Sequence, residues 1–329
     1  MVPTRFVAGL LATVPASIFV SAKGFDYDSL SLREVGARNT IDWRVWLEKD
    51  GDPISFWHDI PLYPNEDDKS IINYYVEIPR WTDGKIETKR NEPLNPIFHD
   101  DKDDKVRFVY SVWPHKTYPF NYGSIPQTWE DSTHVHNFTG LPGDNDPVDI
   151  FDISSLPPGK TGEVKQAKIL GALAMDETTD WKVIAIDVED PLAEIVDNVT
   201  DLDKYRPGLR ESFHDWFIYY KVVKGDGTNT IVGDEYQNAT LARQVVSESH
   251  GYWQQLADGS TDVEKIARNQ TSNPEWASTY IESEKATKAF DIPKKSDVKP
   301  AAERPAEYDV WHYLDENFEV IELPGQRKH

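Results

Sequence analysis

Three segments of the chain alternate bulky apolar and polar side chains, and this alternation predicts half-buried β-strands. They are IDWRVWLE (41–48), IINYYVEI (71–78) and VRFVYSVW (106–113). Three further runs rich in β-branched residues follow, at 147–153, 164–174 and 181–188, and Pro, Gly or Asp clusters separate most of them. Several short strands joined by turns predict a small β-barrel or sandwich.

The period of the apolar positions changes in the second half of the chain. In 209–221 and 241–257, apolar residues recur every three or four positions, which predicts two helices packed outside the sheet. After Phe290 the chain is rich in proline and charge, so we expect an extended C-terminal arm over 291–329. The main domain then covers 23–290, and we find no internal repeat.

The charge balance limits the partners of this chain. Its 329 residues include 35 Lys and Arg against 57 Asp and Glu, a formal net charge of −22. This field repels phosphate backbones and anionic headgroups, so we predict no nucleic-acid and no membrane partner. An anionic substrate would require bound metal to reverse the sign locally. The chain has no cysteine, which excludes disulfides and thiolate chemistry.

The N-terminus has the layout of a targeting segment. Arg5 precedes a largely apolar run, 6–20, and the small pair Ser21 and Ala22, which predicts a signal peptide over 1–22 and a protein that is secreted or stays in the secretory pathway. A mitochondrial transit peptide is the alternative, because no acidic residue precedes Asp26. Four Asn-x-Ser/Thr sequons predict a glycoprotein. They begin at Asn137, Asn198, Asn238 and Asn269.

The segment GDNDPVD (143–149) places three carboxylates within six residues. A flexible loop that enters a strand at Pro147 can direct several carboxylate oxygens toward one hard cation such as Mg²⁺. An EF-hand does not fit, because Val148 stands at its third odd position. An acidic surface turn is the simpler alternative. A second acidic group, 176–180, could complete a site for two metals that activate an attacking water.

Basic and hydroxyl side chains that could hold phosphate oxygens lie among apolar or aromatic neighbours. Each one alone is also compatible with a surface lysine or arginine, or with a packing aromatic. The candidates are Lys85, Arg107, Lys221, Tyr118, Tyr122 and Tyr220.

Taken together, these motifs resemble the family I soluble inorganic pyrophosphatases, in their eukaryotic, fungal-like branch. GDNDPVD resembles the family signature, and the resemblance runs from about residue 35 to 257, with a weaker match around Trp311. The flanking motifs that agree, in order, are FHDIPLY, VEIPRWTDGKIE, LNPI, RFV, NYGSIPQTWED, TGEVKQAKILG, DWKVIAIDVEDPLA and WFIYYK.

The resemblance implies a five-stranded OB-like barrel with outer helices, a homodimer, and hydrolysis of pyrophosphate to two phosphates by a metal-activated water. It implies Mg²⁺ as cofactor, with Mn²⁺ or another divalent cation as alternatives. Carried over by position, the metal-binding carboxylates are Asp144, Asp146, Asp149, Asp176, Asp180 and, farther out, Glu77. The phosphate-holding residues are Lys85, Arg107, Tyr122, Lys182, Tyr220 and Lys221, with Glu87 as a supporting acid.

In the same resemblance Asp146 orients the attacking water, Tyr118 is a proton donor, and Arg107 acts in catalysis as well as in binding. The chain departs from the family in two places: the turn from Asp176 to Asp180 is one residue shorter, and Lys116 stands where a histidine is frequent, near the expected dimer contact at 80–81. Two other functions remain as alternatives: a metal-binding protein without turnover, and oligonucleotide binding on an OB-like barrel, which the net charge disfavours.

Overall fold

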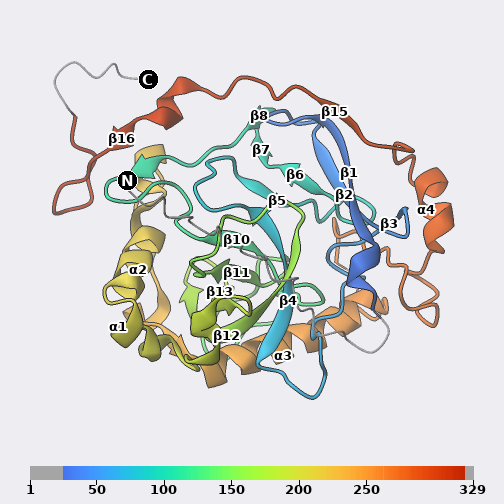
Figure 1. The fold of residues 1–329 in the computed structure, drawn as a ribbon, viewed down its shortest axis with the longest axis horizontal. Helices are drawn as coiled ribbons and strands as arrows, with labels where there is room; N and C mark the ends of the chain where they lie inside the picture. The colour runs from blue at the N-terminus through green and yellow to red at the C-terminus, as the bar shows by residue number, and fades with distance from the viewer. Residues whose placement is uncertain (1–24, 262, 323–329) are drawn as a thin grey trace, which may run out of the picture.

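The computed structural model describes residues 25–261 and 263–322, and the segment predicted as a signal peptide (1–22) lies outside them. Five strands close into a barrel at the centre of the molecule (Figure 1). The pairing runs β13-β11-β10-β4-β12 and returns from β12 to β13, with the short β14 on β12. All pairs in this ring are antiparallel except β11 with β13. The strands are β4 (Ile71–Ile78), β10 (Asn121–Ser124), β11 (Asp149–Asp152), β12 (Val164–Met175), β13 (Asp180–Asp187) and β14 (Gln237–Asn238).

A second sheet packs beside the barrel, with the order β15-β1-β2-β6-β5 and with β3 paired to β2. Its β2 contains most of the strand predicted over 41–48, while β4 matches the prediction of 71–78 at both ends. The strands are β1 (Leu30–Ala37), β2 (Arg44–Lys49), β3 (Asp52–Ile54), β5 (Ile86–Thr88), β6 (Ile97–His99) and β15 (Asp297–Lys299).

The single strand predicted over 106–113 is wrong. The structure has three two-residue strands in this region, β7 (Asp101–Lys102), β8 (Lys105–Val106) and β9 (Ser111–Val112). Between β8 and β9 the backbone hydrogen bonds leave the ladder: Arg107 N donates to Asp100 O at 2.8 Å, and Val109 N donates to Asp83 O at 2.8 Å. The apolar alternation here comes from side chains packed beneath an irregular segment.

Helices cover the outside of the barrel, as predicted (Figure 1). The apolar face of α2 packs its aromatic rings onto Phe120 and Phe151, and α3 packs Ala242, Val245 and Val246 against the barrel strands. The helices are α1 (Leu202–Tyr205), α2 (Leu209–Tyr219), α3 (Ala239–Ala257) and α4 (Ser283–Ala289). Short 3₁₀ turns are η1 (Tyr27–Ser29), η2 (Pro191–Glu194), η3 (Val199–Asp201), η4 (Val222–Lys224), η5 (Val232–Asp234) and η6 (Ala306–Asp309). None of the helices in the described ranges is long and apolar enough to cross a membrane.

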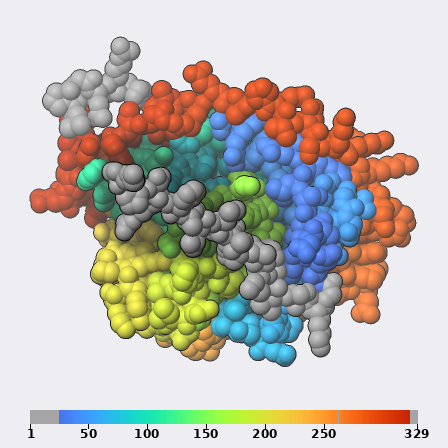
Figure 2. Space-filling model, in the orientation of Figure 1, coloured from blue at the N-terminus to red at the C-terminus, as the bar shows by residue number. Residues whose placement is uncertain are grey.

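The C-terminal arm, described as far as residue 322, wraps one side of the molecule, as the red segment in Figures 1 and 2 shows. Its β15 pairs in parallel with β1, and β16 (Trp311–His312) pairs in parallel with β9. Between them, Arg304 forms ion pairs with Asp83 and Asp309. The predicted fold class, a five-stranded OB-like barrel with outer helices and an irregular arm, is confirmed.

Candidate active site

The loop that carries the first acidic motif lies directly on the backbone of Glu130. Glu130 N donates to Asp146 O, and Asn145 N donates to Glu130 O, both at 3.0 Å. A Cβ on Gly143 would stand 2.2 Å from the carbonyl carbon and oxygen of Glu130, so only glycine allows this approach. The loop is therefore fixed against a buried residue, and the carboxylates of Asp144 and Asp146 are positioned by backbone contacts.

Three carboxylates come together beside this loop. Glu130, Asp144 and Asp180 each offer one oxygen, and these oxygens lie within 4.8 Å of one another. Glu130 is buried; its Oε1 accepts from Trp181 N at 2.6 Å, while its Oε2 has no hydrogen-bond partner among the described residues. A buried carboxylate oxygen with no donor is suited to bind a cation, because burying an unpaired charge is costly. We call these three residues the carboxylate cluster.

Glu130 was missed at the sequence level. It lies within NYGSIPQTWED, one of the motifs that carries the family resemblance. The acidic pair Glu130 and Asp131 in that motif was the signal that could have identified it. Spacing gave no further help, because Glu130 is far in sequence from the two acidic loops that it joins.

Asp149 sits at the start of β11, opposite Lys182 in the parallel register with β13. Lys182 Nζ donates to Asp149 Oδ2 at 2.5 Å and to Asp180 Oδ1 at 2.6 Å, and the Tyr122 hydroxyl donates to Asp149 Oδ2 at 2.5 Å. Three barrel strands thus bring together Asp149, Asp180, Lys182 and Tyr122, all of which the sequence predicted as site residues.

The carboxylates repel one another, and their pKa values are raised. Desolvation, partly offset by Arg90, raises the pKa of Asp146 to about 6, and desolvation, partly offset by Lys182, raises that of Asp149 to about 6. Burial and the neighbouring acidic charges raise the pKa of Asp144 and of Glu130 well above the ordinary range. Metal ions would relieve this repulsion, so the electrostatics favour a cation site.

Glu77 on β4 lies deeper than the other carboxylates. It is 2% exposed, and its Oε1 accepts from Thr88 N at 2.7 Å and from the Thr88 hydroxyl at 2.6 Å. Burial, followed by the charge of Asp149, raises its pKa well above the ordinary range. This position, behind Asp149, agrees with a supporting rather than a directly exposed role.

Two predicted cations share one carboxylate. Arg107 donates to Asp100 Oδ2 at 2.6 Å, Lys85 Nζ lies 3.2 Å from the same oxygen, and Lys85 also pairs with Glu87. Although burial opposes its charge, Glu87 and Asp100 raise the pKa of Lys85, so the ammonium stays protonated. Asp100 was not predicted as a site residue, and no motif marked it.

Tyrosines line the end of α2 that faces the site. Tyr118 is buried, with its ring centroid 5.2 Å from that of Trp216 and 5.5 Å from that of Tyr122. Tyr220 stacks on Trp216 with centroids 4.5 Å apart. Burial, then the neighbouring Tyr220, raises the pKa of Tyr118 well above the ordinary range, so its hydroxyl keeps its proton.

The residues of the second acidic turn, 176–180, do not all lie at the site. Lys221 Nζ lies 3.5 Å from Glu177 Oε2, whereas Asp176 is exposed and does not join the carboxylate cluster.

Arg90, which sequence reasoning did not select, donates to Asp146 Oδ1 at 2.9 Å and to Asp144 O at 3.0 Å. Arg90 lies two residues after the end of β5, but no motif signal separated it from a surface arginine.

Comparisons with known proteins agree with this geometry. The inorganic pyrophosphatase family model matches residues 74–254. The inorganic pyrophosphatase of Debaryomyces hansenii is 42% identical over 290 residues, which are 87% of this chain and 98% of that protein. The inorganic pyrophosphatase structure from Schistosoma japonicum has a TM-score of 0.79 at 36% identity and covers 87% of this chain and 100% of its own. An N-terminally truncated vacuolar soluble pyrophosphatase of Trypanosoma cruzi, solved in complex with PPi, has a TM-score of 0.63 at 34% identity over 75% and 99% of the two chains.

Proposed function

The chain belongs to the inorganic pyrophosphatase family, in its fungal-like branch, and hydrolyses inorganic pyrophosphate to two phosphates; from this premise we propose how its own residues divide the work. The observation that carries the proposal is the buried Glu130, which has one carboxylate oxygen without a donor and joins Asp144 and Asp180 in the carboxylate cluster. Lys182 adjoins this cluster, since its ammonium donates to Asp180 and to Asp149. Such a site can bind cations and a phosphate anion side by side.

Metal dependence follows from the family, and we propose Mg²⁺ as the ion. Bound divalent cations neutralise the substrate and lower the pKa of an attacking water. Carboxylate oxygens with open water positions suit Mg²⁺, and Mn²⁺ accepts the same ligands. The residues that would hold them are Glu130, Asp144, Asp146, Asp149, Asp180 and, on the exposed turn, Asp176, with Glu77 behind them.

We assign the nucleophile's orientation to Asp146 and phosphate binding to the cations around it. Asp146 takes a proton from the attacking water as the water oxygen forms a bond to one phosphorus. The bridging P–O bond to that phosphorus breaks, and the leaving phosphate takes up a proton from a donor on its side. Lys182, Lys221, Lys85 and Arg107 donate to the non-bridging oxygens, with Tyr122 and Tyr220 beside them. Tyr118, whose raised pKa keeps its proton, supplies a donor, and Glu87 holds Lys85 in place.

The test is phosphate release from Mg-pyrophosphate by purified residues 23–329. Asp146→Asn should lower kcat by about a thousandfold, since the position and charge of one general-base carboxylate contribute a factor of this order. Asp67→Asn, which removes an exposed acid on the other side of β4, is the matched control and should retain activity. Equal activity of wild type and Asp146→Asn would remove Asp146 from the reaction.

We also propose that the chain forms a homodimer through an aromatic surface. Trp81, Trp113 and Trp311 are 53%, 57% and 37% exposed, and the rings of Trp113 and Trp311 meet edge to face at 5.5 Å. Arg80 lies over the Trp81 ring at 4.7 Å. Exposed tryptophans are typical of protein interfaces, and positions 80–81 are where the family resemblance puts the dimer contact.

Sedimentation velocity tests the dimer. Wild type should sediment as a dimer, and Trp81→Ser should shift it toward the monomer, while Trp276→Ser, which alters a packed tryptophan elsewhere, should not change the assembly. A wild-type monomer at micromolar concentration would contradict the proposal.

For location, we propose entry into the secretory pathway, with mitochondrial import as the alternative. The support is the sequence of residues 1–22 and an exposed sequon at Asn137. Asn198 is half-buried, and the Asn238 side chain caps α3 by accepting from Leu241 N at 3.0 Å, so Asn137 is the best placed of these three for a glycan. Mass spectrometry of the native protein before and after deglycosylation distinguishes the two locations. A loss of mass at Asn137 on deglycosylation supports export, whereas a chain that carries no glycan and is cleaved within its first residues supports mitochondrial import.

A further inference from the structure

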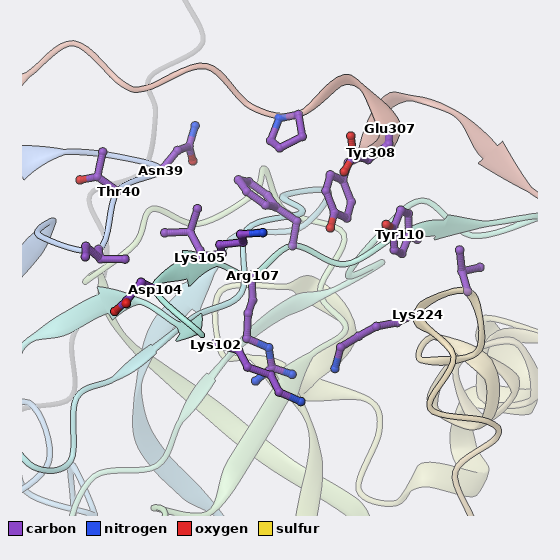
Figure 3. Close-up of a pocket in the computed structure, with 15 residues that line it drawn as sticks. Asn39, Thr40, Lys102, Asp104, Lys105, Arg107, Tyr110, Lys224, Glu307 and Tyr308 are labelled. Atoms are coloured by element: carbon purple, nitrogen blue, oxygen red, sulfur yellow. The ribbon is translucent and has the colours of Figure 1, made fainter. Parts of the chain in front are cut away.

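A cavity of about 760 Å³ has Arg107 in its lining (Figure 3). The β7–β8 hairpin, η4, the turn at 39–41 and the C-terminal arm form its walls. Its size falls within the range of about 300–1,000 Å³ that small-molecule sites occupy. Arg107 is the residue that this cavity shares with the predicted active site.

Four cations line this cavity, and they come from separate elements. Lys102, Lys105, Arg107 and Lys224 face it, and Figure 3 shows that the ends of Lys102, Arg107 and Lys224 point toward one another. Within the described ranges no carboxylate lies within 4.0 Å of the ammonium of Lys102 or Lys105, while Lys224 pairs with Asp226 at 2.7 Å. We call this the lysine cavity.

The lining is opposite in sign to the rest of the protein. The whole chain carries a net charge of −22, yet the lysine cavity has four cations against two acids, Asp104 and Glu307. Figure 3 places both acids on the rim, away from the converging nitrogens. Asp226 and Asp100, which pair with Lys224 and Arg107, compensate part of this charge, so Lys102 and Lys105 are the least compensated cations of the cavity. An anion bound between them and the other two cations would balance the remaining charge.

The aromatic residues of the cavity are already packed. Tyr308 from the arm stacks on Tyr110, with ring centroids 4.4 Å apart, and its ring centroid lies 5.1 Å from that of Phe108. Its ring is therefore engaged by two other rings, and a nucleotide base would have to displace one of them. The lining favours a ligand made of charge and oxygen rather than one with an aromatic base.

We propose that Lys102, Lys105 and Lys224, with Arg107, form a second anion site that binds a polyvalent phosphate anion. The site rests on the proposed function in one respect: Arg107 places it next to bound pyrophosphate. Two sources supply this chemistry, the far end of a linear polyphosphate whose first phosphates lie in the active site, or a separate phosphate ion.

Titration calorimetry with non-hydrolysable ligands tests the site directly, at constant Mg²⁺. The variant is Lys102→Ala/Lys224→Ala, and the control is Lys69→Ala/Lys160→Ala, which removes two exposed lysines elsewhere. If the far end of a chain binds, the Kd of diimidotriphosphate rises about tenfold in the variant, and that of imidodiphosphate changes less than about twofold. If a separate ion binds, orthophosphate added to the imidodiphosphate complex shows a binding step that the variant loses.

The proposal is overturned if neither ligand distinguishes the variant from wild type, or if the control changes both by the same factor. All four lysines are exposed, so both proteins should fold, which near-identical melting curves would verify. Turnover of pyrophosphate by wild type is measured separately: its absence would contradict the proposed function, while these titrations would still report on the lysine cavity.

Discussion

The carboxylate cluster and the lysine cavity both gather charges of one sign, but the protein holds them differently. Glu130, Asp144 and Asp180 lie on strand ends and on a loop that backbone hydrogen bonds fix in place. Lys102 and Lys224 extend from a two-residue strand and a 3₁₀ turn, and both are exposed. Like charges in the first region are locked together, whereas solvent screens those in the second.

This difference has an energetic consequence. Burial first, and then the neighbouring carboxylates, raises the pKa of Glu130 and Asp144, so the metal-free fold holds these charges together at a cost. Removing one such charge should therefore weaken function and strengthen the metal-free fold, since active sites commonly hold strain that stability does not need. Changes at the lysine cavity should leave both properties nearly unaltered.

The largest expected effect is at Glu130. Glu130→Gln keeps the acceptor for Trp181 N but removes a buried charge, so kcat should fall by about a thousandfold while the metal-free protein gains about 1 kcal/mol of stability. Steady-state kinetics and urea denaturation without divalent cations measure the two quantities. Loss of stability together with loss of activity would mean that Glu130 is mainly structural. Glu248→Gln, an exposed acid on α3, is the control.

Gly143→Ala should have the next largest effect. The new Cβ would meet the Glu130 carbonyl, so the loop must shift, and kcat should fall about a hundredfold, because a displacement of about 1 Å costs this much. Gly140→Ala has open space around its Cβ and serves as a control for strain alone, since its φ is +72°. A comparable fall in kcat in both variants would show that strain in the backbone, and not contact with Glu130, lowers the activity.

The pH dependence of metal-free stability tests the shared repulsion. The pKa of Asp146 is raised from 3.8 to about 6, so the folded state binds more protons than the unfolded state in that window, and this contribution to stability falls as pH rises through it. The Asp146 side chain is 44% exposed, so solvent screens part of this effect, and between pH 5 and 7 Asp146→Asn should gain only about 1 °C in Tm relative to wild type. Saturating Mg²⁺ at pH 7 should raise the Tm of wild type. A difference in Tm that does not vary with pH would contradict the assignment.

The smallest effect is expected where the arm closes the lysine cavity. Tyr308→Leu removes an aromatic stack on Tyr110, worth about 0.5–1 kcal/mol, and should lower Tm by about 1–3 °C. Thermal denaturation measures it against Tyr205→Leu, a change at a half-exposed ring on α1. A decrease in Tm of more than 5 °C would show that the arm is essential to the fold. The lysine cavity would then be held nearly as firmly as the carboxylate cluster.

Sequence patterns predicted four of the five barrel strands and both long helices, because period 2 and period 3.6 depend on local burial alone. They did not predict the short strand β10 (Asn121–Ser124). These patterns failed over 106–113. The segment there is irregular although it keeps the same apolar alternation, because its backbone amides donate hydrogen bonds to the carbonyls of Asp83 and Asp100 and do not continue a strand ladder. The acidic loop at 143–149 was also predictable, since hard-cation ligands gather in a short motif. Glu130, Asp100 and Arg90 were not predicted as site residues, because their partners lie 7–56 positions away along the chain.

By itself, therefore, the sequence determined the strands and helices through their periodicity, and the family, the type of barrel and the kinds of side chain at the site through the motifs that carry the family resemblance. Tertiary structure decided which of them meet. It placed Glu130 rather than Asp176 beside Asp144 and Asp180, and it turned Lys102 and Lys224, far apart in the chain, toward one cavity beside Arg107. The physical reason is that charge interactions depend on distance and burial in space, which only closure of the barrel and wrapping of the arm fix.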